Sequence, residues 1–504
     1  MLISIKKQMA ENNKQEEAYR SITKSTAIFG STQVMSMVAN IIKGKLAAHI
    51  VGAYGLGISA HLYSTATPIQ QLFTCGLNIS AVKEISSAKD DQERSECITY
   101  FRRTIMFLSI MAFISTAISA WWLSQLTFGT TEHWIWFIYI AIAVLFLILA
   151  SGETTILQGF RQLKNLATCN LVAPAVGLTV AIPLYWLFGI EGIAPSIAIL
   201  GMASWMAAKL FTRRLKITHC QMSWKDVWLK GRKTITLGAS IMGSTIAGSL
   251  ATYAINTCIS TMGSETDLGL YQASTSITLQ CTSMVFSAMA TDYFPHLSSI
   301  AKVKSKAQDL VSKEGEIAML IIVPIILMLI TIAPVVIRVL LTSEFDVSIF
   351  LLRAMSLCLL SRTLCFPLDY ICIANGDNKF FLLVEGVWSN IKTLVLVIAG
   401  YAIGKLDGIG VALIIGAAID ITISIIANKW RYGIGYSAQY YKTTLVLTLA
   451  AAACFATSLW PDIFVSYLTM SLITISTCIF SYQQIDKRID IKTIIKNRLR
   501  HGKS

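Results

Sequence analysis

Charged residues are scarce in this chain. Lysine, arginine, aspartate and glutamate make up 14% of its 504 residues, whereas 54% are hydrophobic and the mean hydropathy is +0.61. A typical soluble domain is about 25% charged. Acidic residues are the scarcer kind, which leaves a formal net charge of +14. The low charge and high hydropathy predict a polytopic membrane protein. The basic residues are dispersed among short loops and both chain ends, which argues against nucleic acid as a partner and reflects orientation in the membrane.

Motifs that bind metals or nucleotides are also missing. The eleven cysteines lie mostly inside apolar segments, and no C-x-x-C pair or Cys/His cluster occurs in the sequence. We therefore expect neither a metal site nor a disulfide framework. No P-loop occurs either, which argues against ATP as the direct source of energy. The sequence predicts a protein without cofactors.

Apolar segments long enough to cross a membrane recur along the whole chain, and we count about fourteen of them. Basic residues gather in every second loop and in both chain ends, whereas the intervening loops hold mainly acidic residues. This alternation predicts cytoplasmic termini for an all-α polytopic membrane protein. The predicted spans are residues 25–51, 57–85, 105–126, 134–157, 166–188, 193–210, 235–260, 267–296, 316–340, 348–375, 380–403, 408–428, 443–460 and 463–483.

Short sequence matches relate the two halves of the chain at offsets of 212 to 216 residues. An even number of spans separates the copies, which predicts two parallel six-helix lobes followed by two extra C-terminal helices. We expect an N-terminal lobe at 1–215, a cytoplasmic inter-lobe loop at 216–233, a C-terminal lobe at 234–430, and the extra spans with a basic tail at 431–504. The matching pairs are Phe29–Thr32 with Met242–Thr245, Leu56–Gly57 with Leu268–Gly269, Ile85–Ser87 with Leu297–Ser299, and Gly192–Ile193 with Gly408–Ile409.

The first span, Ser25 to Val51, carries a cation at a depth where charge is costly. Lys43 faces either a protein interior or a watery cavity in one interpretation, because an ionisable group facing lipid costs several kcal/mol. In the other interpretation it snorkels to the membrane surface, which we expect for Lys45 on the opposite face. The first interpretation favours an anionic ligand. The polar face of this helix consists of Gln33, Ser36, Asn40, Lys43 and Ala47.

Two later spans carry charges of both signs. Arg362 and Asp369 lie seven positions apart on the tenth span, and Glu385 and Lys392 have the same spacing on the eleventh. Counted from the turn between these spans, the two acids lie at similar depth, and so do the two bases. The residues either pair diagonally as structural ion pairs or form a proton or cation route coupled to transport. We expect water to reach Glu153 and Asp420, which lie nearer the cytoplasmic ends of their spans.

The opening FGSTQVMSMVANIIKGKLAAHIVGAYGLGISAHLYS, with the layout of spans and the internal repeat, resembles the Wzx-type flippases of the MOP superfamily. This superfamily also includes lipid II flippases and MATE drug exporters. The resemblance implies two lobes in a V shape, with a central cavity lined by spans one, two, seven and eight. It also implies the cargo: an undecaprenyl-pyrophosphate-linked oligosaccharide, an O-antigen or similar polysaccharide repeat unit. Alternating access would carry it to the outer leaflet of the bacterial inner membrane.

Polar side chains in those four spans are the expected contacts for such a cargo. Cations suit the pyrophosphate, while amides, hydroxyls and aromatic faces suit sugars. The alternative is that small and hydroxyl residues only let the helices pack closely. We expect the lipid-linked glycan and membrane lipid as partners, with a polysaccharide polymerase as a further one. The candidate substrate contacts are Gln33, Asn40, Lys43, His61, Gln71, Tyr253, Asn256 and Gln272.

Two other functions stay open at this point. A cation-coupled drug antiporter of the MATE kind would need uncompensated acids on the same four spans, and these spans carry almost none except Asp292. A membrane-embedded polymerase or ligase would need a large outer loop for its catalytic residues, and the predicted outer loops are short. The sequence therefore favours a flippase that is not an enzyme.

Overall fold

The computed structural model describes residues 2–74, 76–160, 162–215, 217, 220, 222–301 and 303–489. It describes side chains from residue 35 onward, except at some helical positions that include 228–241, 292 and 385. These residues are almost entirely helical, and no strand occurs among them. Seven segments of the described chain are long and apolar enough to cross a membrane. The predicted all-helical membrane fold is confirmed.

Two compact units make up the chain, Met1–Ser249 and Leu250–Ser504, and each is described by itself. The boundary falls inside α9 (Trp224–Met262). This helix starts before the predicted seventh span, 235–260. Residues 224–233 of the predicted inter-lobe loop are therefore helical.

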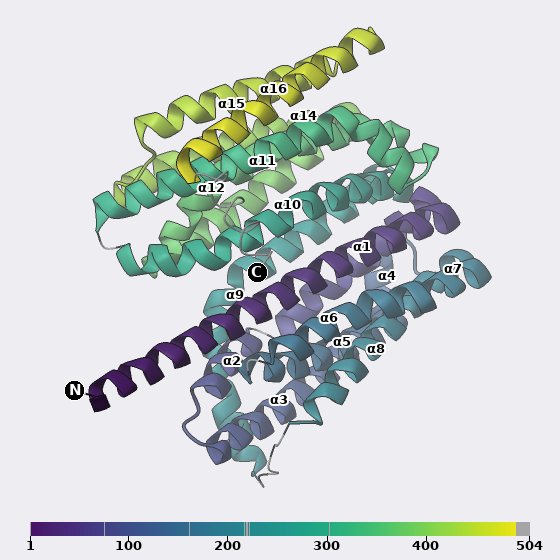
Figure 1. Cartoon of the computed structure of the whole chain (residues 1–504). Coiled ribbons are helices and arrows are strands. Elements are labelled where there is room, and N and C mark those ends of the chain that lie inside the picture. Colours follow the sequence, from purple (N-terminus) through teal and green to yellow (C-terminus); the bar gives the residue numbers. More distant parts are fainter. Residues whose placement is uncertain are drawn as a thin grey trace. The chain divides into compact units, whose positions relative to one another are not determined.

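The first unit packs around α5, which contacts α8 and α3 along their lengths (Figure 1). Its core is aliphatic and aromatic, with Phe137, Ile140 and Ile148 of α5 fully buried. Asp90 starts α3 by accepting a hydrogen bond from the Glu93 amide at 2.6 Å, as a helix N-cap does. The elements are α1 (Leu2–Thr74), α2 (Leu77–Ser87), α3 (Asp91–Ile118), α4 (Ala120–Phe128), α5 (Trp134–Gly159), α6 (Leu163–Val176), the π-helix η1 (Gly177–Ala181), α7 (Ile182–Phe188), the 3₁₀ turn η2 (Gly189–Gly192) and α8 (Ile193–Thr212).

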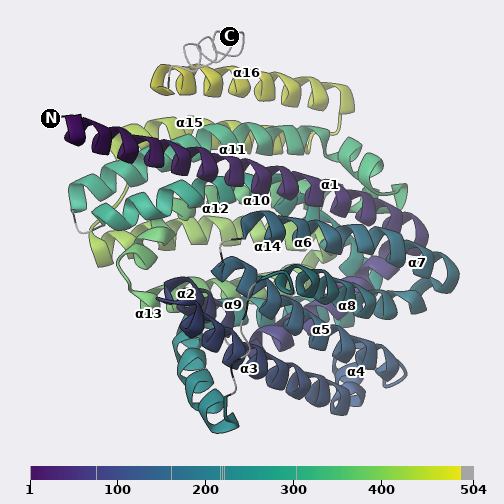
Figure 2. The ribbon, with the colours of Figure 1, turned by 60° about the horizontal axis from the view of Figure 1, so that its bottom comes forward.

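The second unit packs around α11 and α12, with α14 against α12 and the two last helices against α11 (Figure 2). Ser264 and Ser437 cap the helices that follow them, α10 and α15, through side-chain hydrogen bonds to backbone amides. The elements are the end of α9, α10 (Glu265–Ile300), α11 (Lys304–Leu340), the 3₁₀ turn η3 (Ser343–Ser348), α12 (Ile349–Ala374), α13 (Asn378–Phe381), the π-helix η4 (Leu382–Trp388), α14 (Ser389–Tyr432), α15 (Ala438–Thr457) and α16 (Ile463–Ile489).

Two of these elements each run from one predicted span into the next. In α1 the backbone breaks at Gly52, with φ 63° and ψ −169°, between the predicted first and second spans. In α14 the break is at Gly404 and Lys405, between the eleventh and twelfth. The predicted second span, 57–85, is itself interrupted, because α1 ends at Thr74 and a left-handed Gly76 precedes α2.

The internal repeat is visible in the backbone of two turns. Gly189 has φ 56° and ψ −128°, and Lys405, 216 residues later, has φ 50° and ψ −133°. Three residues after each of them, at Gly192 and Gly408, an added Cβ would collide with a carbonyl oxygen eight residues earlier in the chain. The turn between the predicted fifth and sixth spans therefore has the same conformation as the turn between the eleventh and twelfth.

Glu153 corrects one expectation about water. Its side chain is only 7% exposed. The carboxylate lies 2.6 Å from an Arg102 nitrogen and 2.8 Å from Lys209 Nζ, and it accepts a hydrogen bond of 2.5 Å from the Thr212 hydroxyl. The carboxylate thus joins α5 to α3 and α8 rather than facing water, because two basic side chains replace the solvent.

Another buried carboxylate holds the last two helices to the second unit. Glu316 of α11 lies 2.5 Å from an Arg488 nitrogen of α16 and accepts a hydrogen bond of 2.6 Å from the Thr443 hydroxyl of α15. Figure 2 shows these three helices side by side. The extra spans are therefore bound to the lobe through a specific polar contact as well as through apolar packing.

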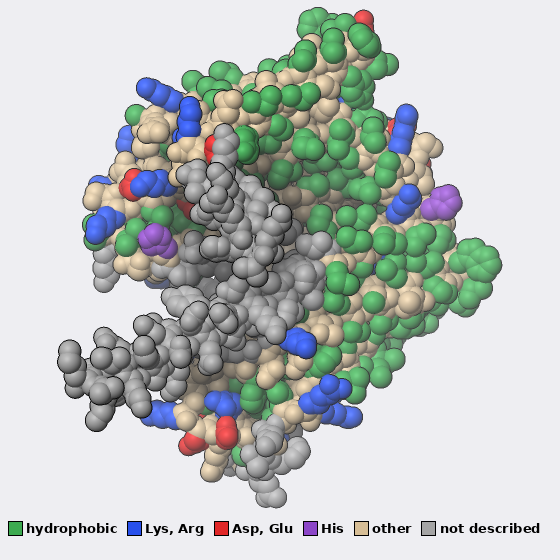
Figure 3. All heavy atoms as spheres, viewed as in Figure 1, with side chains coloured by type: hydrophobic (Ala, Val, Ile, Leu, Met, Phe, Trp, Pro, Cys, Tyr) green, Lys and Arg blue, Asp and Glu red, His purple; other side chains and the backbone are tan. Residues whose placement is uncertain are grey.

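The outer surface is apolar over both units. Large side chains such as Trp186, Ile403 and Trp430 are 78%, 88% and 79% exposed. Figure 3 shows hydrophobic side chains covering much of one face, with lysine and arginine toward its margins. Such a surface is stable only in contact with lipid, as the membrane fold requires.

Candidate functional site

Lys43 lies in a half-buried position on α1, against the second half of that helix and η1. Its Nζ is 5.9 Å from the centroid of the Tyr63 ring. A Cβ placed on Gly177 would lie 3.4 Å from the Lys43 Cδ and 3.5 Å from its Nζ, so the glycine leaves room for the lysine side chain. Tyr185 lies within electrostatic reach of the ammonium group. Within the described part of the chain, no acidic group pairs with Lys43.

The lysine two positions further along behaves differently. Lys45 is exposed, whereas Lys43 is partly covered by protein. Because the two side chains leave the helix in nearly opposite directions, only Lys43 faces the interior of the unit. This placement supports the interior interpretation for Lys43 and the snorkelling interpretation for Lys45.

The other candidates on α1 have varied surroundings. Asn40 is exposed, one turn before Lys43. His61 is 0% exposed, and its ring packs against Phe128 with centroids 5.2 Å apart. Gln71 is half-buried and accepts a hydrogen bond of 2.8 Å from the Ser249 hydroxyl. Gln33 lies in the helix, but its side chain is outside the described residues.

Three candidates belong to the second unit. Asn256, at the repeat position of Lys43, is 2% exposed, and its side-chain oxygen has no hydrogen-bond partner among the described residues. Tyr253, on the same helix, is half-buried. Gln272 of α10 lies 3.5 Å from the Ser276 hydroxyl. These residues supply polar groups to α9 and α10, but the described contacts do not join them into one cluster.

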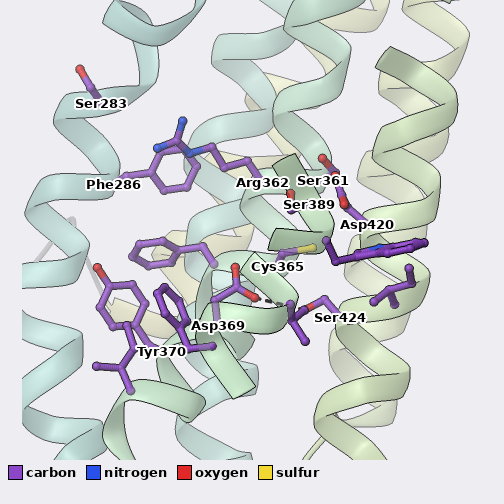
Figure 4. A pocket seen from close by; sticks show the side chains of 16 residues that line it. Ser283, Phe286, Ser361, Arg362, Cys365, Asp369, Tyr370, Ser389, Asp420 and Ser424 are labelled. Atoms are coloured by element: carbon purple, nitrogen blue, oxygen red, sulfur yellow. Dashed lines mark hydrogen bonds between the residues drawn. The ribbon is translucent and has the colours of Figure 1, made fainter. Parts of the chain in front are cut away.

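The two charged residues of the tenth span line a cavity inside the second unit. The cavity has a volume of about 600 Å³ and lies between α10, α12 and the η4–α14 segment. Arg362 and Asp369 line it, as does Asp420 (Figure 4). Asp369 accepts a hydrogen bond of 3.3 Å from the Ser424 hydroxyl. The seven-residue spacing of Arg362 and Asp369 on one helix face therefore predicted two of the residues that line this cavity.

The pairing of these charges differs from the expected diagonal arrangement. Lys392 forms an ion pair with Asp420, on the helix that follows the turn at Lys405, and also donates to the Gly416 carbonyl oxygen at 3.3 Å. Its partner is thus not an acid of the tenth span. Glu385 has its side chain outside the described residues. The hypothesis of an ion route through Asp369 and Glu385 stays a prediction.

Sequence reasoning missed three features of the cavity. Water can reach Asp420, as expected, because its side chain is 32% exposed, but its ion pair with Lys392 was not predicted. Lys392 and Asp420 lie 13 and 15 residues from the turn at Lys405, so counting outward from that turn would have paired them. Trp388 also lines the cavity, at the end of a π-helix. No sequence pattern marks a π-helical turn, although such turns are frequent at functional sites.

Comparison with known proteins adds the family. The family described as "Polysaccharide biosynthesis protein" matches residues 22–301, which is more than half of the chain. The chain belongs to this family. The lipid III flippases of Escherichia coli (strain K12) and Shigella flexneri are each 20% identical to it over 296 residues, 58% of this chain and 70% of theirs.

Solved structures show the same fold. The lipid II flippase MurJ in an inward closed conformation aligns with a TM-score of 0.68 at 13% identity, over 92% of this chain and 99% of that one. An inward-facing multidrug resistance MATE transporter of the MOP superfamily aligns with a TM-score of 0.66 at 15% identity, over 81% and 98%. The predicted resemblance to MOP-superfamily flippases is confirmed, and these similar proteins are named as transporters and flippases rather than enzymes.

Proposed function

We propose that this member of the polysaccharide biosynthesis family translocates an undecaprenyl-pyrophosphate-linked oligosaccharide. The cargo is an O-antigen or similar repeat unit, moved from the inner to the outer leaflet of the bacterial inner membrane by alternating access. Lys43 carries the proposal, because it is a half-buried cation beside Tyr63 with no acid paired to it in the described residues. A cation at membrane depth is costly without a counter-charge. A phosphate group supplies that charge through short, charge-assisted hydrogen bonds.

The family and its relatives support a lipid-linked glycan as the cargo. The matching family is described by polysaccharide biosynthesis, and the similar flippases are named for lipid III and lipid II. In this proposal Asn40 and Gln71 of the first unit, and Tyr253, Asn256 and Gln272 of the second, are further residues that bind the cargo. His61 supports the site through its packing on Phe128. Both termini are cytoplasmic, and a polysaccharide polymerase receives the translocated product.

A cation-coupled multidrug antiporter is the alternative that the fold alone also fits. A site for cationic drugs needs carboxylates without cationic partners. The buried carboxylates of Glu153 and Glu316 are instead held by arginine or lysine. Lys43, which has no acidic partner in the described part of the chain, would repel such a drug, so the charges favour the glycan flippase.

Complementation in a bacterial strain lacking its own polysaccharide translocase tests the function. The expected result is restored surface polysaccharide, with no change in susceptibility to ethidium, a cationic dye. Membrane abundance of the protein is measured in parallel. Increased resistance to the dye without restored polysaccharide would overturn the proposal in favour of the antiporter.

A further inference from the structure

The cavity of the second unit has a polar and aromatic lining that the phosphate-binding role of Lys43 does not use. One face of α12 carries Arg362, Phe366, Asp369 and Tyr370, which follow one another at helical spacing and all line the cavity. At about 1.5 Å of rise per residue, Arg362 and Asp369 are roughly 10 Å apart along the helix axis. The Arg362 guanidinium thus offers hydrogen-bond donors at one end of this helix face, and the Asp369 carboxylate offers acceptors near the other end. The rings of Phe366 and Tyr370 lie between and beside these two groups.

The charges of the cavity balance one another. Lys392 neutralises Asp420 in the wall. Arg362 has no acidic partner among the described residues, and its guanidinium lies 5.2 Å from the centroid of the Phe286 ring. Figure 4 shows Arg362 beside that ring and Asp369 below it, joined to Ser424. The described lining therefore offers both donors and acceptors without a net excess of negative charge, which disfavours a cationic ligand.

Aromatic rings make up part of the cavity wall, and one of them is exposed. The Phe366 ring packs on Phe286 and on Tyr370, with ring centroids 5.2 and 5.0 Å apart. Trp388, at the end of η4, lines the same cavity and is 49% exposed. An aromatic face carries partial negative charge, which attracts the polarised C–H groups on one side of a sugar ring. The hydroxyls at the edge of that ring need donors and acceptors such as Arg362 and Asp369.

Other ligand classes fit less well. The described residues contain no group of three or more His, Cys, Asp or Glu side chains that would hold a metal ion. A lipid tail would leave the charged groups of the wall desolvated without hydrogen-bond partners. The volume of about 600 Å³ falls within the roughly 300–1,000 Å³ of small-molecule sites.

We propose that this cavity is a sugar-binding subsite, in which one or two sugar units of the glycan stack on the aromatic wall and hydrogen-bond to Arg362 and Asp369. The inference rests on the proposed function, which supplies a glycan as cargo. It goes further by naming which part of the cargo is bound, and where.

Saturation-transfer NMR on the purified full-length protein in detergent tests the subsite directly. The probes are glucose, galactose, N-acetylglucosamine and glucuronate, with choline as a cationic control. The wild type transfers saturation to the ring protons of at least one sugar and not to choline. Trp388→Ala weakens the binding of that sugar about fivefold, as expected for the loss of one aromatic contact. Trp388→Tyr restores most of it, because a stacking face is kept.

The matched control is Trp430→Ala, which removes an exposed tryptophan of the same unit that does not line the cavity. It leaves sugar binding unchanged. Arg362→Gln provides a second variant that does not depend on the tryptophan, and it lowers the signal as well. Absence of any sugar signal in the wild type, or equal signals in all four variants, would overturn the subsite.

Surface polysaccharide in the complemented strain separates this inference from the proposed function. Sugar binding that depends on Trp388, in a protein that restores no polysaccharide, would overturn the flippase function but leave the subsite standing. Restored polysaccharide, together with no effect of Trp388→Ala on sugar binding or export, would support the flippase function but overturn the subsite. If Asp369→Asn abolished the response of export to an uncoupler while sugar signals stayed unchanged, the carboxylate would belong to an ion route, and the subsite as stated would be wrong.

Discussion

The ammonium group of Lys43 lies 5.9 Å from the centre of the Tyr63 ring, and both residues belong to α1, on either side of its break at Gly52. A ring at this distance attracts a cation by about 0.5–2 kcal/mol. It does so without neutralising the charge, as a carboxylate would. Lys43 is therefore held in the interior of the unit while its charge remains available to an anion.

The first prediction concerns the charge of this lysine. Lys43→Ala strongly reduces polysaccharide export at unchanged membrane abundance, because the side chain supports binding rather than packing. Lys43→Arg retains much activity, although the planar guanidinium fits a phosphate differently. Lys43→Glu is worse than Lys43→Ala, because a like charge repels the phosphate in addition to removing its partner. Surface polysaccharide in a complemented strain is the measurement.

Lys45→Ala is the matched control for that series. It removes the same side chain from the exposed face of the same helix turn, so only a mild effect is expected. Equal and mild effects at both positions would mean that both lysines snorkel, and Lys43 would lose its proposed role.

The second prediction concerns the buried carboxylate of Glu153. Glu153→Gln leaves Arg102 and Lys209 without their counter-charge, and breaking a buried pair in this way costs about 3–5 kcal/mol. We expect the lower end of this range, because the two basic side chains are 28% and 29% exposed. The thermal unfolding midpoint in detergent and the membrane abundance both fall.

Glu132→Gln is the control for this substitution, because Glu132 is an exposed acid of the same unit. It leaves the unfolding midpoint unchanged. A midpoint as high in Glu153→Gln as in this control would show that the network around Glu153 adds nothing to stability.

Hydropathy and loop charge predicted most of the helices, because lipid allows only segments whose backbone groups are satisfied internally. The predicted fourth span, 134–157, corresponds to Trp134–Gly159, and the predicted ninth ends with its helix at residue 340. The predicted starting residues of the helices were less accurate at the ends predicted to face the cytoplasm. For example, α11 begins at Lys304 rather than near 316, because polar residues extend a helix beyond the apolar core.

Side-chain pairing was harder to predict than helix position. Arg362 and Asp369 were found because they share one helix face, which is a local property of the sequence. The partner of Lys392 depended instead on which neighbouring helix approaches it, and that is set by tertiary packing. The π-helical turns η1 and η4 carry no local signal either, yet one adjoins Lys43 and the other ends at Trp388 of the cavity.

The third prediction concerns topology. In a variant without native cysteines, a single cysteine at Glu265 or Glu344 reacts with an impermeant maleimide added outside the cell, because both positions lie in loops predicted to face outward. A cysteine at Lys225 is spared until the membrane is permeabilised. The reverse pattern would overturn the predicted cytoplasmic location of both termini.

The last prediction uses the internal repeat as its own control. Lys405 is a non-glycine residue with positive φ, in nearly the same conformation as Gly189 at the equivalent turn. A side chain in such a region costs about 1–3 kcal/mol, whereas glycine loses about 0.5–1 kcal/mol more backbone entropy on folding. Lys405→Gly should therefore raise the unfolding midpoint, and Gly189→Ala should lower it, although a Cβ at Gly189 meets no atom within 4 Å. Because the space around Gly189 is open, a lower midpoint there reports backbone strain alone. Opposite shifts at the two turns would establish that they share one strained conformation, and shifts of the same sign would contradict it.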